Sequence, residues 1–497
     1  MMHEPEKSDA VVVAVKPANK AERSAAELVE PRTATKGNVD QQSTRRAQDR
    51  ASVSQALERI RTAARQRKKA RFTSLLHHVD PAMLRTAFYA VKRDAAPGVD
   101  GMTWETYEQD LDRRIEALHA RIGRGAYRAL PSRRSYIPKE DGSKRPLAVA
   151  ALEDKIVQRA VAAVLSAIHE EDFLGFSYGF RPKRSQHDAL DALIVGISSR
   201  KVNFILDADI RSFFTEVSQE WVVCFLEHRI GDKRIIRLVQ KWLRAGVLED
   251  GIVTIEEKGT GQGSVISPLL ANVYLHYVFD LWARQWRRRH ARGDVVVVRF
   301  ADDLVVSFQY RDDAVRFWAD LRDRFATFGL ELNDDKTRLI EFGRFAAQTR
   351  EANGLGKPET FEFLGFTHVC AKSRAGRFKL KRVTSKKRMR AKLHEVKAEL
   401  RRRMHHPIPE QGAWLARVVR GHLAYYAVPD NSEALRAFAN AVIRYWLQTL
   451  RRRSQRHRMN RDRIHRLASR WLPQPRILHP WPTTRFDATT QGRSPVR

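Results

Sequence analysis

Two adjacent carboxylates, Asp302 and Asp303, stand between two apolar runs, and this feature most constrains what the chain can fold into. Residues 295–298 are four valines, and residues 304–308 (Leu-Val-Val-Ser-Phe) are again largely apolar. Such runs on both sides of a short polar pair predict a β-hairpin with the acidic pair at its tight turn. Like charges at a turn repel each other, so a bound cation such as Mg²⁺ is one reason to place them there, and a solvated Asp-Asp turn is the alternative.

Charge and composition narrow the classes of partner. The chain has 497 residues, 43% of them hydrophobic, which is enough for about two to four domains. Lys and Arg number 91 against 58 Asp and Glu, and the resulting net charge of +33 predicts a polyanionic partner, with nucleic acid favoured over an anionic membrane. No apolar run reaches the length of a membrane span, and Val11 to Val13 is too short for a signal sequence. We therefore expect a soluble protein of the bacterial cytoplasm, with an organelle as the alternative.

The cysteine content excludes two kinds of structural site. Cys224 and Cys370 are the two cysteines of the sequence, which leaves neither a disulfide framework nor a Cys-rich zinc site.

Composition shifts predict four regions. Residues 1–55 mix Glu, Lys, Ser, Ala and Thr with few large apolar residues, so we predict a disordered N-terminal tail. Residues 56–371 alternate strand and helix patterns. In residues 372–450, Lys and Arg become denser and helical periodicity dominates. Residues 451–497 are rich in Arg, Pro and Trp, and we expect them to lie along a surface.

Periodicity and turn residues predict the individual elements. Ser267 and Pro268 suit the N-cap and first position of a helix. Strands are predicted at 133–138, 202–210, 338–342 and 361–367, and helices at 107–122, 152–168, 186–198, 221–228, 234–245, 267–278 and 313–328.

A second predicted strand also carries carboxylates near its end, and it can bring them close to Asp302 and Asp303. The buried strand predicted at 202–210 contains Asp207 and Asp209 near its end. If it pairs with the Asp302–Asp303 hairpin, Asp209 lies beside both carboxylates. Three carboxylates can hold two Mg²⁺ ions about 3.5–4 Å apart, which is the equipment of nucleotidyl transfer.

The order of short motifs around these acids resembles the reverse transcriptase/maturase encoded by group II introns, over roughly residues 72–470. Phe300 departs from the tyrosine most common in that family, and the loss of a hydroxyl leaves the ring in place. The matching blocks are 97–101 (Pro-Gly-Val-Asp-Gly), 144–147 with 153–154, 178–182 (Tyr-Gly-Phe-Arg-Pro), 209–214, 261–270, 332–337 and 363–365.

This resemblance implies an α+β fold of the right-hand polymerase type. The fingers and palm, with an antiparallel sheet and packed helices, would occupy residues 56–371. A mainly α-helical thumb/maturase domain would follow at 372–450, and a basic RNA- or DNA-binding tail at 451–497. The implied activity is RNA-directed DNA polymerisation, combined with binding of the host intron RNA to assist splicing and mobility.

The resemblance also implies residue roles. Asp209, Asp302 and Asp303 would bind two Mg²⁺ ions and carry catalysis. Lys336 would protonate or screen the departing pyrophosphate, with a purely structural lysine as the alternative. Arg and Lys side chains would grip the incoming triphosphate, although each could contact the template instead. Phe214 would exclude a ribose 2′-hydroxyl, while Phe213 is expected in the core. The substrate-binding set is Lys144, Arg145, Arg181, Phe214, Gln262 and Gly263.

Residues 420–426 resemble the glycine and paired tyrosines of the maturase domain. The tyrosines could stack on RNA, but packing in the core is the favoured interpretation for them. The implied RNA-binding set is Lys379, Lys381, Arg382, Lys386, Lys387, Arg388, Tyr425 and Tyr426. Implied partners are group II intron RNA, an RNA template with a DNA primer, target DNA and dNTPs, with a homodimer as a further option. Paired Cys or His residues do not follow Leu450, so we expect no endonuclease and insertion from a nick or a replication-fork primer.

Two other readings stay open. The first is an RNA-binding splicing factor whose polymerase site is vestigial, which the full acidic set argues against. The second is a retron, diversity-generating or CRISPR-associated reverse transcriptase. The motif at 97–101 and the long basic region favour the intron type.

Overall fold

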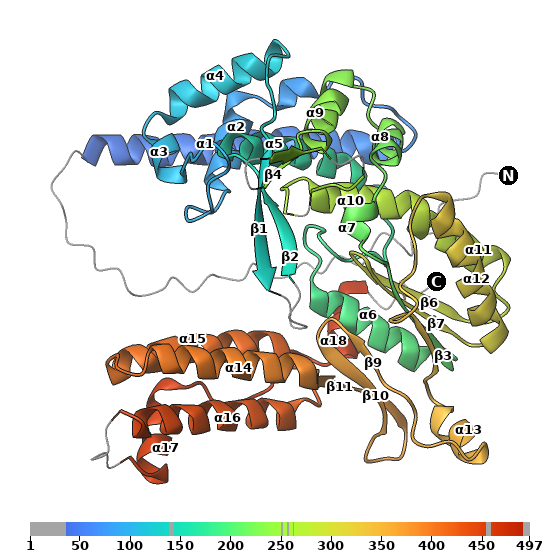
Figure 1. The fold of residues 1–497 in the computed structure, drawn as a ribbon. Helices are drawn as coiled ribbons and strands as arrows, with labels where there is room; N and C mark the ends of the chain where they lie inside the picture. The colour runs from blue at the N-terminus through green and yellow to red at the C-terminus, as the bar shows by residue number, and fades with distance from the viewer. Residues whose placement is uncertain are drawn as a thin grey trace.

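A computed structural model shows how these segments fold, and it describes residues 36–138, 144–249, 252–255, 258–261, 263–453 and 459–490. Figure 1 shows a helical body at the top, a sheet with helices on both faces at the right, and a helical unit at the lower left. The predicted α+β fold class is confirmed.

The central sheet carries both acidic segments. Its strands run in the order β6-β7-β3-β8, and every neighbouring pair is antiparallel. The strands are β6 (Val295–Phe300), β7 (Asp303–Phe308), β3 (Phe204–Asp209) and β8 (Arg338–Glu341). The hairpin predicted around the acidic pair is therefore present, and the second acidic strand pairs with it.

Alternate residues of this sheet enter two separate cores. Val295 and Val297 belong to the core on one side, whereas Val296 and Val298 belong to the core on the other. Because helices cover both faces, the strand is apolar without interruption instead of alternating. The covering helices are α6 (Gln186–Ser199) on the second core, and α10 (Ser267–Leu275) and α12 (Arg311–Thr327) on the first.

Helix α10 starts where the sequence predicted, but its N-cap is different. Ile266 occupies the cap position, and Pro268 lies in the first turn. Ser267 donates its hydroxyl to the carbonyls of Thr260 and Gly261. The serine therefore ties the preceding loop to the helix instead of capping it.

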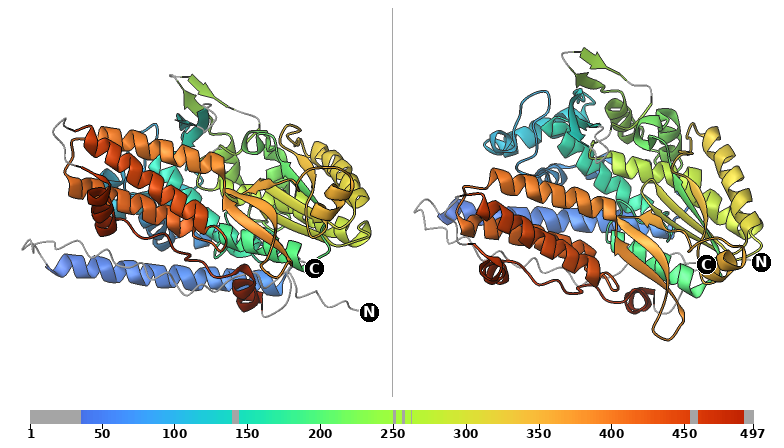
Figure 2. Two further views of the ribbon diagram at one scale, coloured as in Figure 1. Left: turned by 90° about the horizontal axis from the view of Figure 1, so that it is seen from below. Right: turned by 60° about the horizontal axis from the view of Figure 1, so that its bottom comes forward.

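The N-terminal body is helical, and its first helix corrects the predicted tail. Helix α1 (Lys36–Gln66) begins well before residue 56 and runs as one long helix against α2 and α5 (Figure 2). Val53 is buried, and Asp49 accepts a hydrogen bond from Arg85 at 2.8 Å. Residues 1–35 of the predicted tail lie outside the described residues. The other helices of the body are α2 (Pro81–Tyr89), α3 (Trp104–Glu108), α4 (Leu111–Gly123), α5 (Leu152–His169), α8 (Gln219–Glu227) and α9 (Lys233–Leu243). The short helix α7 (Phe213–Glu216) follows β3, and α11 (Leu281–Arg289) lies beside α12 at the right of Figure 1.

A second sheet projects from this body. Strands β1 (Ser132–Pro138) and β2 (Lys144–Val149) form an antiparallel hairpin that points toward the helical unit at the lower left (Figure 1). The sheet is completed by β4 (Val247–Glu249), parallel to β1, and by β5 (Ile252–Thr254).

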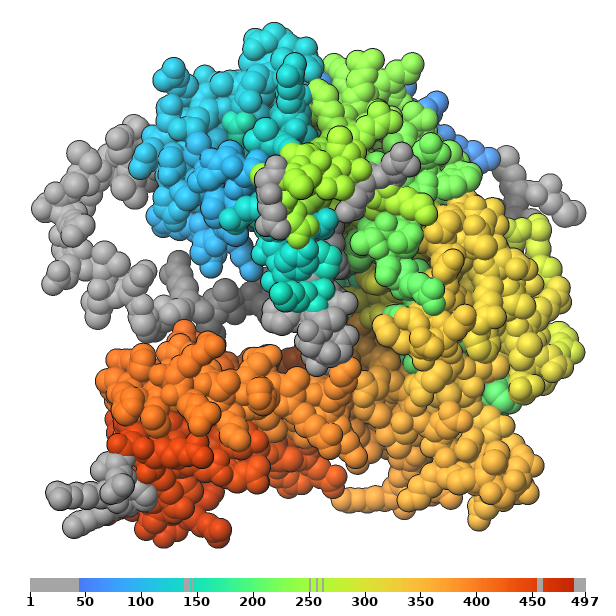
Figure 3. Space-filling view, in the orientation of Figure 1, coloured from blue at the N-terminus to red at the C-terminus, as the bar shows by residue number. Residues whose placement is uncertain are grey.

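A three-stranded sheet links the central sheet to the last helices. It contains β9 (Phe361–Phe363), β10 (Phe366–Lys372) and β11 (Phe378–Thr384). Strand β11 was not predicted, and helix starts only at α14, so the change of structure comes later than residue 372. Helices α14 (Lys386–Arg402), α15 (Ile408–Tyr426) and α16 (Ser432–Arg451) form the unit drawn in orange and red in Figure 3, and α13 (Ala346–Ala352) precedes the sheet.

The C-terminal segment returns to the central sheet. It forms α17 (Arg461–Trp471) and α18 (Pro482–Thr490). Helix α18 packs against α6, where Phe486 is buried. In the part of the chain that the structure describes, no helix has the length and apolar content of a membrane span.

Candidate active site

The central sheet brings the predicted carboxylates together. Asp209 at the end of β3 is the direct cross-strand partner of Asp303 at the start of β7. Asp302 precedes Asp303 in the β6–β7 turn, where Ala301 adopts a left-handed conformation with φ of 56°. Directly opposed residues in an antiparallel pair lie about 5 Å apart, which places Asp209 beside Asp303 at one end of the two central strands, with Asp302 next to them in the turn.

Lys336 joins this group from the loop before β8. Its Nζ donates to Asp209 Oδ2 at 3.2 Å. Asn333, which sequence analysis missed, donates from Nδ2 to the same oxygen at 3.3 Å, and its backbone N–H donates to the Asp209 carbonyl at 2.8 Å. The motif at 332–337 therefore orients Asp209 through its lysine and also through the amide of Asn333, three residues earlier.

The Asp303 carboxyl ionises less readily than an ordinary aspartate, because of burial first and of neighbouring negative charges second. Although part of the Asp303 side chain reaches solvent, burial and the charges of Asp302, Asp209 and Asp207 raise the pKa of Asp303 to about 7, against a lowering by Arg388. Burial also raises the pKa of Asp207 to about 6. A divalent cation would relieve this repulsion.

The donor set fits such an ion. Carboxylate oxygens are the ligands that Mg²⁺ prefers. Among the described residues, however, no group of three or more His, Cys, Asp or Glu side chains converges as a metal site, and Asp209 turns to Lys336 instead. Asp209, Asp302 and Asp303 are the residues that would hold the ion.

Two residues of the predicted substrate-binding set, Phe214 and Gly263, lie at or against the loop that precedes α10. Phe214 is half-buried with its ring 5.3 Å from that of the buried Phe213, and its carbonyl accepts from the Thr260 N–H at 3.1 Å. Gly263 has φ of 109°, and a β-carbon there would lie 3.0 Å from the carbonyl oxygen of Ala148. The close approach of this loop to β2 therefore requires glycine. Gln262 lies outside the described residues.

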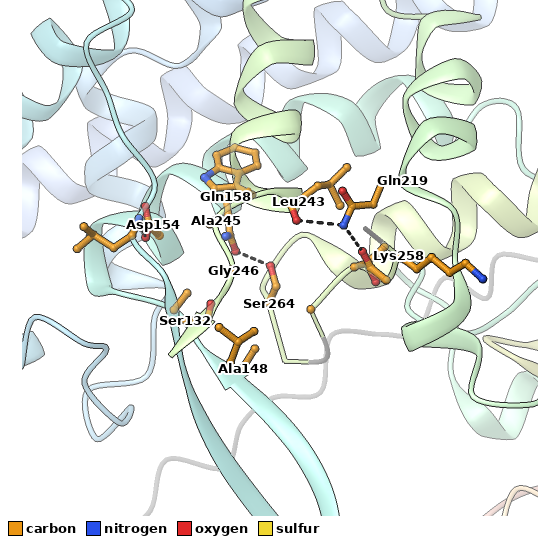
Figure 4. A pocket seen from close by; sticks show the side chains of 17 residues that line it. Ser132, Ala148, Asp154, Gln158, Gln219, Leu243, Ala245, Gly246, Lys258 and Ser264 are labelled. Carbon is orange, nitrogen blue, oxygen red and sulfur yellow. Dashed lines mark hydrogen bonds between the residues drawn. The ribbon is translucent and has the colours of Figure 1, made fainter. Parts of the chain in front are cut away.

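Two glutamines hold the loop at residues 258–264 around a pocket (Figure 4). Gln158 accepts from the Ser264 hydroxyl at 2.8 Å. Gln219 donates to the carbonyls of Leu243 at 3.1 Å and Gly259 at 3.2 Å. Sequence analysis missed both glutamines, because each acts on a loop far away in the chain.

The cations predicted to bind the triphosphate lie in different surroundings. Lys144 is exposed at the start of β2, with its Nζ 6.0 Å from the ring centroid of Tyr136. Arg145 pairs with Ile137 through the backbone, and its side chain lies outside the described residues.

The prediction for Arg181 is corrected by its surroundings. Its side chain is 2% exposed and forms an ion pair with Glu170 at 3.0 Å. It also donates to the carbonyls of Leu174 at 2.7 Å and Ser177 at 2.8 Å. The guanidinium therefore bonds to residues 170–177 of its own segment and does not extend to Asp209, Asp302 and Asp303.

The predicted RNA-binding residues divide into exposed and buried sets. Lys386, Lys387 and Arg388 are exposed in the first turn of α14. Lys381 is half-buried, and Lys379 pairs with Asp430 at 2.6 Å.

Three members of that set are structural, which corrects their prediction. Arg382 is buried and pairs with Asp191 at 3.0 Å. Tyr425 donates its hydroxyl to the Leu364 carbonyl at 2.8 Å, and Tyr426 packs beside it with rings 4.8 Å apart. Core packing, the favoured interpretation for the two tyrosines, is what the structure shows.

Comparison with known proteins agrees with this arrangement. Residues 137–368 match the family described as reverse transcriptase (RNA-dependent DNA polymerase). Protein YkfC of Escherichia coli is 32% identical over 49% of this chain and 72% of its own length. Group II intron-encoded protein LtrA of Lactococcus lactis is 31% identical over 44% of this chain and 37% of its own length. A putative COX1/OXI3 intron 1 protein of Saccharomyces cerevisiae is 31% identical over 45% of this chain and 26% of its own length.

The chain therefore belongs to the reverse transcriptase family. By class it is an RNA-directed DNA polymerase. Within the family it is related to the proteins encoded by group II introns, as the sequence motifs predicted.

Proposed function

We propose that this chain copies RNA into DNA by adding dNTPs to a primer 3′-hydroxyl, with two Mg²⁺ ions held by Asp209, Asp302 and Asp303. The observation that carries the proposal is the cross-strand pairing of Asp209 with Asp303, which joins two acidic segments that are far apart in sequence. When bound, the ions would activate the attacking oxygen and stabilise the leaving group.

The surrounding residues supply binding and proton transfer. Lys336 holds its ammonium group against Asp209, where it can give a proton to the departing pyrophosphate. Lys144 is an exposed cation on the β1–β2 hairpin that would attract the triphosphate.

The direct test is dNTP incorporation by the full chain on a DNA-primed RNA template with Mg²⁺. Extension is the expected result. A folded protein that binds RNA but extends no primer would favour the splicing-factor alternative instead.

Replacement of Phe214 by valine is expected to admit ribonucleotides. The smaller side chain opens space beside a ribose 2′-hydroxyl, and the preference for dNTP over rNTP should fall by about 10- to 200-fold. Single-nucleotide incorporation kinetics with matched dNTP and rNTP measure this ratio. Phe345→Val, which alters an exposed phenylalanine before α13, is the control and should keep the preference.

We further propose that the chain binds its host group II intron RNA to assist splicing and mobility. Two observations support this: relatives whose names describe group II intron-encoded and intron proteins, and the exposed cations that start α14. Intron RNA domains should then flank the gene. Their absence would favour a retron, diversity-generating or CRISPR-associated enzyme and leave the polymerase proposal standing.

RNA affinity is expected to fall steeply with salt. Each phosphate contact releases counterions, so a complex with about six to ten contacts loses about 10³- to 10⁵-fold in affinity between about 50 and 200 mM salt. Filter binding at several salt concentrations measures the slope. Lys386→Gln with Lys387→Gln should make the slope shallower, whereas an unchanged slope would remove these residues from the interface.

A further inference from the structure

Arg299 lies directly before the Phe300–Asp303 segment, and it is fully buried. Its guanidinium makes five hydrogen bonds. Nε and Nη2 donate to the two carboxylate oxygens of Asp280 at 2.7 and 2.6 Å. Nη2 also donates to Ser177 Oγ at 2.6 Å, and Nη1 donates to Asn272 Oδ1 at 3.1 Å and to the carbonyl of Ala301 at 3.0 Å. Every nitrogen of this side chain therefore has an assigned partner.

The Ala301 contact links this cluster to the catalytic turn. Ala301 is in the left-handed region with φ of 56°, which costs an alanine about 1 kcal/mol or more unless its surroundings impose it. Arg299 holds the carbonyl of this residue, and the peptide that contains that carbonyl leads directly into Asp302. The position of the turn therefore depends on the position of the guanidinium.

A second contact holds the turn from the other side. A β-carbon at Gly179 would lie 2.2 Å from the backbone nitrogen of Ala301, so the two backbones are in close contact. Asn272 donates from Nδ2 to the Gly179 carbonyl at 2.8 Å while its oxygen accepts from Arg299. Asn272 thus ties the guanidinium to the segment that packs on the turn.

The anion that holds Arg299 comes from an irregular helix. Residues His276–Asp280 form a π-helical turn between α10 and α11. The wider π-helical turn rotates the side chains that follow it relative to those of α10. Asn272 before the turn and Asp280 at its end both bond to Arg299. Burial disfavours the Asp280 carboxylate, yet its pKa remains below the usual value because Arg299 pairs with it.

We propose that Arg299, anchored by Asp280 and Asn272, is a positioning residue that sets the β6–β7 turn so that Asp302 and Asp303 converge with Asp209 on the metal ions. This inference rests on the proposed function of those carboxylates. Arg299 itself touches neither substrate nor ion, and it acts through the backbone of Ala301.

The test compares two buried arginines in the full-length protein. Arg299→Lys keeps the positive charge but cannot bond Asp280, Asn272 and Ala301 together. Arg229→Lys is the matched control, because Arg229 is also buried, pairs with Asp172 at 3.0 Å and donates to backbone carbonyls, but it does so at the end of α1. Mn²⁺ binding, followed by electron paramagnetic resonance, reports on the carboxylates without requiring turnover.

We expect Arg299→Lys to weaken Mn²⁺ binding by about 10- to 100-fold, because residues that orient metal ligands have effects of this size. The kcat of primer extension should fall by a similar factor while the KM for dNTP stays constant. Arg229→Lys should leave all three quantities unchanged. A folded Arg299→Lys protein with wild-type Mn²⁺ affinity and kcat would overturn the proposal.

If Arg299→Lys does not fold, Asn272→Ala decides the question. It removes the link between Arg299 and Gly179 but leaves the Asp280 ion pair intact. Weaker Mn²⁺ binding at constant dNTP KM would support the proposal, and wild-type values would overturn it. If the wild-type chain extends no primer, the polymerase proposal fails, and the Mn²⁺ comparison still tests the positioning role separately.

Discussion

Replacement of Asp302 by asparagine is expected to lower dNTP addition by about 10³-fold or more. The amide keeps the shape of the side chain but removes the charge that would hold Mg²⁺, and the loss of several kcal/mol of transition-state stabilisation corresponds to this factor. Asp303→Asn and Asp209→Asn should give losses of the same order, because Asp209 pairs directly with Asp303 and the proposed ions need all three carboxylates. Single-turnover primer extension measures the effect, with circular dichroism to establish the fold.

Asp312→Asn is the matched control for this set. Asp312 is an exposed aspartate in the first turn of α12, where it accepts from Arg292 at 2.9 Å. The Asp312→Asn protein should extend the primer at the wild-type rate. A folded Asp302→Asn protein that matches this control would show that the carboxylate does not take part in synthesis.

Replacement of Asp191 by alanine is expected to destabilise the protein by about 3–5 kcal/mol. Asp191 is 2% exposed and accepts from Arg382 of β11 at 3.0 Å and from Arg485 of α18. Its removal leaves two guanidiniums without their counter-charge in a buried site, which is the costly way to break an ion pair. Urea unfolding measures the loss of free energy.

The same change should release the C-terminal segment. Because Arg485 anchors α18 to α6, limited proteolysis should cleave the segment that precedes α18 faster in Asp191→Ala than in the wild type. Asp112→Ala is the control, since Asp112 also accepts from two arginines, Arg45 at 2.8 Å and Arg85 at 3.5 Å, but is exposed. Exposed pairs contribute about 0–1 kcal/mol. Equal losses in the two variants would show that the buried junction is not a special anchor.

Local elements could be predicted well because their signals are local. The valine run and the acidic pair predicted the hairpin, and apolar periodicity predicted α5, α6 and α12 within a few residues. The missed strand β11 (Phe378–Thr384) shows the limit of this reasoning. Phe378 and Leu380 alternate with lysines, but the next residue on the same face is Arg382, so the strand pattern ends early and pairing with β10 decides the structure.

Side-chain roles were harder to predict when the partner was distant. The basic run around Arg382 resembles a phosphate-binding surface, but the counter-ion of Arg382 is Asp191, which is 191 residues away in the chain. Arg485 lies 294 residues from the same carboxylate. No local pattern distinguishes a solvated arginine from one that a remote aspartate will bury.

The sequence by itself determined the class of the protein. The short motifs around the acidic residues occur in a fixed order, and this order can be recognised without knowing the fold. The sequence also predicted Asp209, Asp302, Asp303 and Lys336 as site residues, and in the structure Asp209 pairs with Asp303 across the strands and contacts Lys336. Only the tertiary structure decided which cations face solvent and what holds the catalytic turn in place. The physical reason is that burial and pairing depend on residues from several elements at once, as the junctions at Asp191 and Arg299 show.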